Sequence, residues 1–283
     1  MMSKKPQKRL TPKQKERRKF LRSIALTVGV SGMALLGMVP VLGKWVQRLR
    51  PPGALKEEKF LAACIKCGQC VQVCPVEAIK LADMTDGLGV GVPHIDPREQ
   101  ACDFSCDGLQ CVLACPTGAL IHEISFPSEV DMGIAKTVNL KQCLAVNGQG
   151  FKGLARGADF KGKLRYAQID RWNPIKLAEH PYDLELCDLC VRQCPIEISI
   201  AECAAEDEKR QSGKVDLVAV RQKNECPPKH AIELQEIDGR MTPVILDGCV
   251  GCGVCEMVCP VEPAVIVMDS SDSRANSQGM RTL

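Results

Sequence analysis

Four groups of closely spaced cysteines constrain this chain more than any other feature. Three groups are complete, each with four cysteines and a proline directly after the last one, and they span residues 64–75, 102–116 and 249–260. A further group, at residues 187–195, has the same ending but lacks a leading cysteine. Cysteines separated by two residues bring their sulfur atoms together, because the intervening residues form a tight loop. The chain is therefore expected to wrap around several compact sulfur-bound groups.

The spacing favours iron–sulfur clusters over zinc or disulfides. The first and last groups read Cys-x2-Cys-x2-Cys-x3-Cys-Pro, a pattern whose fourth cysteine ligates the other cluster of a pair. Structural zinc sites use one or two Cys-x2–4-Cys pairs, often with histidine, and a disulfide framework does not need triplets at this spacing. The four groups supply fifteen predicted ligands: Cys64, Cys67, Cys70, Cys74, Cys102, Cys106, Cys111, Cys115, Cys187, Cys190, Cys194, Cys249, Cys252, Cys255 and Cys259.

Composition and charge limit the partners. Aromatic residues make up 4% of the 283 residues, so the hydrophobic core alone is expected to be weak, and bound clusters would add cross-links. The net charge of +3 is distributed unevenly along the chain. Residues 1–22 hold ten Lys or Arg and one acidic residue, and the rest of the chain holds 27 basic and 33 acidic residues. The mildly acidic body argues against nucleic acid and favours a basic face on another redox protein.

The N-terminal segment is predicted to be an export signal. Residues 17–22 (RRKFLR) match a twin-arginine signal, and the uncharged segment Ser23–Gly43 behind them is long enough to span a membrane. Two outcomes fit this segment, namely cleavage near Gly43 or retention as an anchor in the cytoplasmic membrane. Both outcomes predict a periplasmic body, exported by a route that carries proteins already folded around their cofactors.

The body is predicted to repeat a unit of strand, cysteine loop, short helix, Cys-Pro and strand. Apolar alternations follow the complete groups at residues 78–81, 119–122 and 265–268, and partner segments lie at residues 92–95, 137–140 and 243–246. Residues 231–246 are typical of a hairpin with Asp238-Gly239 as its turn. One unit is too small to bury a core, so two units would share two clusters. The predicted fold is α+β and loop-rich, with tandem bacterial-ferredoxin-like modules.

These features divide the chain into three parts. Residues 1–43 form the export signal or anchor, residues 44–268 the body, and residues 269–283 a polar tail that we expect to be disordered. The units of the body are expected at about 55–84, 92–125, 138–198 and 240–268, and an insertion interrupts the third. No nucleotide-binding loop stands out, and the histidines are scattered, at positions 94, 122, 180 and 230. The sequence thus predicts an electron-transfer subunit without a substrate of its own.

From Arg50 onward the chain closely resembles the NapG/MauM family of ferredoxin-type proteins. The resemblance rests on residues 50–54, 60–75, 102–120, 141–148, 187–195 and 248–259, and on the twin-arginine signal. It implies a periplasmic carrier of four [4Fe-4S] clusters. It also implies two partners, a membrane quinol dehydrogenase of the NapH type and a periplasmic reductase or cytochrome, in nitrate reduction or methylamine oxidation. The alternative function is that of a maturation factor for a partner metalloreductase, which a labile, incompletely loaded set of clusters would favour.

The resemblance also assigns the missing ligand of the third group. In the family a leading cysteine precedes this group, and the matching residue is Cys143. Two insertions interrupt the match, one at residues 149–186, which contains Trp172, and one at residues 199–230. The first is interpreted either as a partner-docking loop or as a solvated surface loop. Cys226 in the second insertion is the alternative ligand, because a proline follows it; if Cys143 is the ligand, Cys226 and Cys203 are free to form a disulfide.

Two arrangements exchange the fourth cysteines between groups. In the nested arrangement the first group pairs with the last, and the second with the third. In the sequential arrangement the first pairs with the second, and the third with the last. Resemblance to related electron-transfer subunits favours nesting, which would place Cys74 with the last group and Cys259 with the first. The set of ligands is the same in both arrangements.

Overall fold

The computed structural model of the protein describes residues 12–42, 48–84, 89–106, 108–165, 174–211 and 226–271. Trp172 and residues 272–283 of the predicted tail lie outside these ranges, as do the side chains of residues 34–42 in the predicted apolar segment. The chain divides into two compact units. One contains Met1–Val46 and Asp83–Val90, and the other contains Gln47–Ala82 and Gly91–Leu283.

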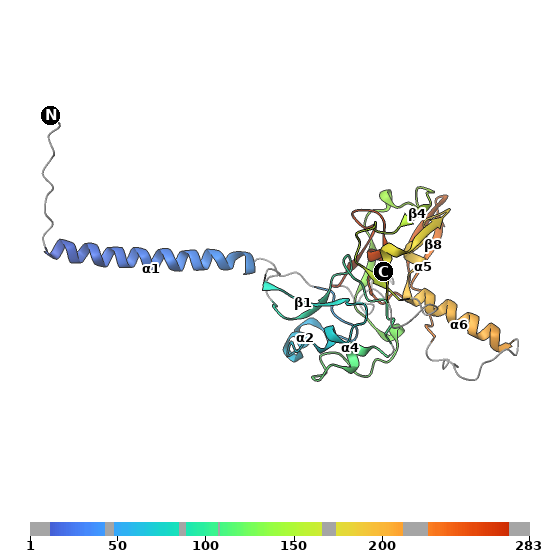
Figure 1. Cartoon of the computed structure of the whole chain (residues 1–283), viewed down its shortest axis with the longest axis horizontal. Helices are drawn as coiled ribbons and strands as arrows, with labels where there is room; N and C mark the ends of the chain where they lie inside the picture. The colour runs from blue at the N-terminus through green and yellow to red at the C-terminus, as the bar shows by residue number, and fades with distance from the viewer. Residues whose placement is uncertain are drawn as a thin grey trace, which may run out of the picture. The chain divides into compact units, whose positions relative to one another are not determined.

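The first unit contains the helix α1 (Pro12–Leu42), which carries the predicted export signal (Figure 1). Arg17 and Arg18 are both exposed on it. Within the described residues, no helix has the length and apolar character needed to cross a membrane.

The second unit combines short helices with two-stranded antiparallel ribbons. The described ribbons pair β1 (Ile79–Leu81) with β2 (Pro93–Ile95), β3 (Ile134–Thr137) with β10 (Ile266–Asp269), β4 (Phe151–Leu154) with β7 (Pro181–Leu184), β5 (Lys163–Leu164) with β6 (Ile175–Lys176), and β8 (Ile232–Ile237) with β9 (Arg240–Ile245). In the ribbon of β3 and β10, Ile266 lies opposite Thr137, so a strand near the end of the body pairs with a strand near its middle in the sequence. The predicted mixture of helix, strand and loop is confirmed.

One-turn helices begin inside each cysteine group. They are α3 (Gln69–Gln72), α4 (Gln110–Leu113), α5 (Leu189–Arg192) and α7 (Val254–Val258). Gly68 and Gly253 precede α3 and α7 in the left-handed conformation, which lets the cysteine loop turn sharply into the helix. The other helical segments are α2 (Glu57–Ala63), α6 (Pro195–Gln211), and the 3-10 turns η2 (Pro127–Glu129), η3 (Leu140–Gln142) and η4 (Leu177–Glu179).

Two hydrophobic cores lie within the second unit. One is built from residues 49–132 around Phe60 and Leu120, and the other from residues 101–266 around Leu189 and Met257. Phe60 is the one aromatic side chain among the fully buried residues that are described, in line with the low aromatic content. Both cores include cysteines, so the residues predicted to bind clusters also take part in core packing.

The predicted strands are partly correct. Residues 79–81 pair with residues 93–95, and the hairpin at residues 231–246 forms, with Asp238 and Gly239 both at positive φ in its turn. The prediction of a strand at residues 119–122 is wrong. There, Leu120 forms an isolated bridge with Ala54, because the segment packs against the chain that enters α2 and finds no extended partner.

The insertion at residues 149–186 packs into the second core in its described part. Ala155, Leu164 and Leu177 are buried there, and β4 and β7 form one of the ribbons. Gln100 fastens the insertion from outside, since its amide donates to the Lys163 carbonyl and accepts from the Lys163 N–H. The interpretation as a fully solvated loop is therefore wrong for these residues.

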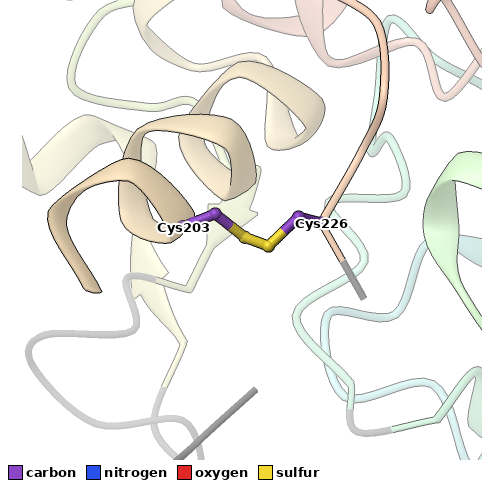
Figure 2. The surroundings of a disulfide bond; sticks show 2 residues. All are labelled: Cys203 and Cys226. Carbon is purple, nitrogen blue, oxygen red and sulfur yellow. A yellow bond between two sulfur atoms is a disulfide. The ribbon is translucent and has the colours of Figure 1, made fainter. Parts of the chain in front are cut away.

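The insertion at residues 199–230 holds a disulfide. Cys203 on α6 is bonded to Cys226, and the predicted bridge is confirmed (Figure 2). The start of α6 is fixed by a second contact, because the Glu197 carboxylate accepts hydrogen bonds from the backbone N–H of Ala231 and from the ring of His230. The bridge and this carboxylate together tie α6 to the segment that leads into β8.

Candidate functional site

The sixteen cysteines outside the disulfide gather into four groups of four, numbered here in the chain order of the runs that supply most of their members. Group I is Cys64, Cys67, Cys70 and Cys115; group II is Cys102, Cys106, Cys111 and Cys74; group III is Cys143, Cys187, Cys190 and Cys259; group IV is Cys249, Cys252, Cys255 and Cys194. In every group, three sulfurs come from one segment or its immediate partner and the fourth comes from the Cys-Pro end of another run.

The fourth cysteines are exchanged sequentially between the groups, so the predicted nesting is wrong. Cys115 lines the hollow of group I, and Cys74 interacts electrostatically with Cys102, Cys106 and Cys111 of group II. Groups III and IV exchange Cys259 and Cys194 in the same manner. The physical reason is that each exchanging pair shares one hydrophobic core, and α3 packs on α4 as α5 packs on α7.

Cys143 and not Cys226 joins the third group. Cys143 lines the same hollow as Cys187 and Cys190 and follows directly after η3. A hydrogen bond joins the two ends of the insertion, because the Cys187 N–H donates to the Gln149 carbonyl at 3.1 Å. This bond holds Cys187 close to the segment that follows Cys143. Cys226 is unavailable as a ligand, since its sulfur is bonded to Cys203.

The cysteines of groups I, III and IV each line a hollow in the protein. Other hollow-lining residues are largely apolar, for example Phe60 and Leu120 in group I and Ile232 and Val250 in group IV. Among the described residues, no three Cys, His, Asp or Glu side chains are placed to hold a single metal ion. Four sulfurs around an apolar hollow fit a cofactor of several atoms that is bound by thiolates.

Backbone N–H groups point at the sulfur atoms of the Cys-Pro ends. The Ala78 N–H donates to Cys74 Sγ at 3.3 Å, and the Val265 N–H donates to Cys259 Sγ at 3.5 Å. Burial by itself would raise the pKa of Cys115, but hydrogen bonds from the backbone of Leu120, among others, lower it. The turn after each Cys-Pro therefore offers donors to a charged sulfur, which is the form that binds iron.

Several buried thiols of these groups resist ionisation when no metal compensates their charge. Burial, followed by repulsion from the neighbouring cysteines, raises the pKa of Cys70 to about 11 and that of Cys111 to about 12. Burial raises the pKa of Cys187 to about 11, and burial raises that of Cys194 to about 12. Four such thiols become favourable together only around a cationic centre, so this donor set is suited to iron.

Sequence reasoning missed two residues that hold the groups in place. Arg98 donates to the carbonyls of Glu256, Cys259 and Val261 and to the carboxylate of Glu262, so it clamps the last turn of the fourth run. No local signal marks Arg98, because about 160 residues separate it from its acceptors. Asp103 is the second missed residue, and its position directly after a ligand was the available signal.

One of the scattered histidines reaches a ligand residue. His122 Nε2 lies 2.9 Å from the carbonyl oxygen of Cys115 and donates to it. His230 pairs with Glu197 beside group IV, and His94 contacts Arg48. In each of these described contacts the histidine binds another residue of the protein.

Comparison with known proteins agrees with this arrangement. Residues 63–119 match the family model of a 4Fe-4S dicluster domain, and residues 246–262 match that of a 4Fe-4S binding domain. The chain is 32% identical to the ferredoxin-type protein NapG of Escherichia coli, over 91% of this chain and 87% of the relative. It is 33% identical to the methylamine utilization ferredoxin-type protein MauM of Paracoccus denitrificans, over 91% and 89%.

The chain belongs to the NapG/MauM family of ferredoxin-type proteins. The dicluster match covers groups I and II together, which is the pair that exchanges Cys74 and Cys115. Another MauM, from Methylorubrum extorquens, is 32% identical over 90% of this chain and 89% of the relative. No solved structure matches the chain. A NapG/MauM protein with 4Fe-4S domains and this donor set is an iron–sulfur protein of the electron-transfer type.

Proposed function

We propose that this NapG/MauM protein carries four [4Fe-4S] clusters, one in each cysteine group, and relays electrons between a membrane quinol-oxidising partner and a periplasmic reductase or cytochrome. The observation that supports the number four is the grouping of sixteen cysteines into four sets, each completed by a cysteine from its neighbour. The ligands are the fifteen cysteines of the motifs together with Cys143.

Each part of the site has a defined task in this proposal. When bound, a cluster supplies one-electron transfer at its sulfur-ligated iron. The exchanged cysteines fasten two runs of the chain into one body, and the apolar walls exclude water. The N–H groups of Ala78 and Val265 stabilise negative charge on Cys74 and Cys259. In this proposal none of these groups transfers a proton or binds a substrate.

Export and the choice of partners belong to the same proposal. The twin arginines, Arg17 and Arg18, and the apolar segment behind them support delivery to the periplasm and association with the cytoplasmic membrane. Replacing both arginines by lysine should leave the loaded protein in the cytoplasm, which fractionation and immunoblotting would detect. The name of the MauM relatives supports methylamine utilization as one setting. The membrane partner in this proposal is a NapH-like dehydrogenase.

The first test is the iron and sulfide content of the protein, purified without oxygen. Four clusters require four irons and four sulfides for each group, and a lower stoichiometry in fully folded protein would contradict the number. The second test adds the protein to quinol-reducing membrane vesicles and follows the clusters by electron paramagnetic resonance. Rapid reduction that a quinol-site inhibitor blocks supports the relay. Loaded clusters that stay oxidised would refute delivery from quinol and leave the maturation function.

A further inference from the structure

The first and the last cysteine runs end with the same four residues, Cys-Pro-Val-Glu, at positions 74–77 and 259–262. In the first run this turn closes locally, because the Glu77 N–H donates to the Cys74 carbonyl at 3.2 Å, and Glu77 has a φ of 58°. In the last run Pro263 comes next, and a proline restricts the residue before it to extended conformations. The turn of the last run therefore needs a donor from elsewhere in the chain.

Arg98 supplies this donor from the opposite half of the second unit, where a half is the part of the chain built around one hydrophobic core. It lies three residues after β2, a strand of the first of the two cores. Its guanidinium donates to the carbonyls of Cys259 and Val261, both at 2.9 Å. It also donates to the Glu256 carbonyl and the Glu262 carboxylate, both at 2.6 Å. Because a guanidinium holds its donors in a fixed geometry, these four contacts fix the turn in one place.

The insertion at residues 149–186 adds a second arginine to this turn. Arg156 follows β4 by two residues, and its guanidinium donates to the carbonyls of Arg98 and Met257, both at 3.1 Å. The same guanidinium lies over the ring of Phe160, 4.4 Å from its centroid. Met257 is in the last turn of α7, where the final carbonyls have no partner within the helix. Arg156 therefore braces both the first arginine and the helix that leads into the exchanged cysteine.

In the described contacts, the other exchanged cysteines are held locally. The carbonyl of Cys115 accepts from His122 Nε2 at 2.9 Å, and that of Cys194 accepts from the Ile198 N–H at 2.9 Å. These donors lie seven and four residues further along the chain, whereas the arginine that donates to Cys259 lies 161 residues away. Among the described contacts, Cys259 is therefore the exchanged cysteine whose carbonyl is held from the opposite half.

We propose that Arg98 and Arg156 are positioning residues that hold Cys259 at group III, and that the insertion at residues 149–186 serves to brace this ligand. The inference rests on the proposed function, in which group III holds one cluster and Cys259 binds one of its irons. Without the arginines, the carbonyls of this turn lose their donors and regain partners only by moving toward water. The thiolate of Cys259 then leaves its iron more often than the other three ligands of the group do.

The experiment replaces either arginine by glutamine in the full, loaded protein and adds limiting ferricyanide without oxygen. An iron that has lost its thiolate is then released, so that one [4Fe-4S]²⁺ cluster gives one [3Fe-4S]⁺ cluster and one Fe²⁺, and ferricyanide accepts the one electron set free. The three-iron product gives an electron paramagnetic resonance signal, whereas the [4Fe-4S]²⁺ cluster gives none. We expect this signal to form several-fold faster in Arg98→Gln and in Arg156→Gln than in the original protein.

A variant without the group III cluster shows where the signal arises. Cys187→Ala/Cys190→Ala removes two ligands of that cluster, so adding Arg98→Gln to this variant should no longer accelerate the signal. An acceleration that persists would place the weakened ligand in another group and would overturn the inference.

Arg50 provides a matched control. Its side chain is 13% exposed, compared with 19% for Arg98 and 16% for Arg156. It also donates to a carbonyl, that of Pro93, at 2.9 Å, and it lies over an aromatic ring, that of Phe60, at 5.3 Å. Arg50→Gln should lower the thermal unfolding temperature and leave the rate of the signal unchanged, since these contacts are made away from the Cys-Pro turns. An equal acceleration in Arg50→Gln would mean that the loss of any largely buried arginine loosens a cluster, and would overturn the inference.

Glu262→Gln separates the carbonyl contacts from the ion pair. The Glu262 side chain is exposed, and this change removes its charge while the bonds from Arg98 to the carbonyls remain, so the signal should form at the original rate. An acceleration as large as that in Arg98→Gln would assign the effect to the ion pair and overturn the role of the carbonyl contacts.

Arg156→Gln carries the test if Arg98→Gln does not fold, because it leaves the side-chain contacts of Arg98 in place. An unchanged rate in this variant, fully loaded, would overturn the inference. Iron and sulfide analysis separates this result from failure of the proposed function, which would show as fewer than four clusters in the unsubstituted protein.

Discussion

Cys143 is the ligand whose assignment depends most on the structure, and its substitution has a clear expected effect. Cys143→Ala should remove the iron of one cluster, because group III then retains three thiolates. Cys226→Ala is the matched control and should keep all the iron, since Cys226 is bonded to Cys203. Iron content per chain and the cluster absorbance measure both outcomes. Equal loss of iron in the two variants would contradict the assignment.

The pair of His230 and Glu197 should make stability depend on pH. The hydrogen bond and charge of Glu197 raise the pKa of His230 above its ordinary value of 6.5. A raised pKa means that the folded state binds the proton more tightly. The pair therefore contributes fully below about pH 6.5 and loses its contribution as the pH rises through the folded-state value.

His230→Gln measures this contribution directly. The difference in thermal unfolding temperature between the original protein and this variant should be largest near pH 6 and should shrink above it. Glu197→Gln should remove the pH dependence as well. A difference that is constant across this range would show that the pair acts through its geometry alone.

At the residue scale, the sequence indicated which cysteines gather together but not their neighbours. Fifteen of these cysteines could be predicted because a cluster needs several thiolates from one short loop, which fixes their spacing. Cys143 required family resemblance, since the insertion at residues 149–186 separates it from Cys187. Arg98 had no pattern of its own, because its contacts form only when distant segments pack together, whereas Asp103 was marked by its position directly after Cys102.

Among the elements, the cysteine loop of group IV is more tightly packed than that of group I. Gly251 and Gly68 have nearly the same φ, +76° and +75°, so alanine at either position carries the strain of a left-handed conformation, about 1 kcal/mol or more. A Cβ at Gly251 would also overlap the backbone of Gly133, whereas at Gly68 the nearest atom, in Leu81, is 3.8 Å away.

Gly251→Ala should therefore destabilise the protein more than Gly68→Ala does. The added clash pushes the loop of group IV away from the segment before β3, so the cluster in group IV should be lost faster. The rate at which the cluster absorbance decays in denaturant, measured without oxygen, compares the two variants. Equal rates would mean that the Gly133 backbone moves aside without a loss of stability.

The disulfide that anchors α6 should stabilise the fold without affecting the clusters. It joins residues 23 apart in sequence, and closing a loop of this length in the unfolded chain contributes about 3 kcal/mol to the free energy of unfolding. A Cys203→Ser/Cys226→Ser variant should unfold at lower denaturant concentration and retain its full iron content. Reductant should shift the original protein by a similar amount and leave the variant unchanged.

Elements that close locally could be predicted, and elements that need a distant partner could not. The hairpin at residues 231–246 carries its own turn, so it appears where the sequence indicates. The strand expected at residues 119–122 reduces to one bridge, because its alternation of apolar residues serves burial against Ala54 and not extension of a sheet. About 130 residues separate β3 from β10 in the sequence, so no turn motif could predict that pairing.

At the scale of the whole molecule, the exchange of cysteines between groups depends on which runs share a hydrophobic core. Nesting would require the first run to pack against the last, but Phe60 and Val112 belong to one core and Leu189 and Met257 to the other. Ligand spacing is identical in the two arrangements, so the cysteines alone could not decide between them. Only the apolar residues around the cysteines distinguish the partners, and those residues are similar in all four runs.

Two double variants can distinguish the sequential from the nested exchange of cysteines by their iron content alone. Cys74 and Cys111 lie together in group II, so a Cys74→Ala/Cys111→Ala variant should lose one cluster, because both changes damage the same site. Cys255 lies in group IV, so a Cys74→Ala/Cys255→Ala variant should lose two clusters. The nested arrangement reverses these results, because it places Cys74 with Cys255. Iron and sulfide counts on the two double variants, with each single variant as control, therefore decide how the halves of this carrier are joined.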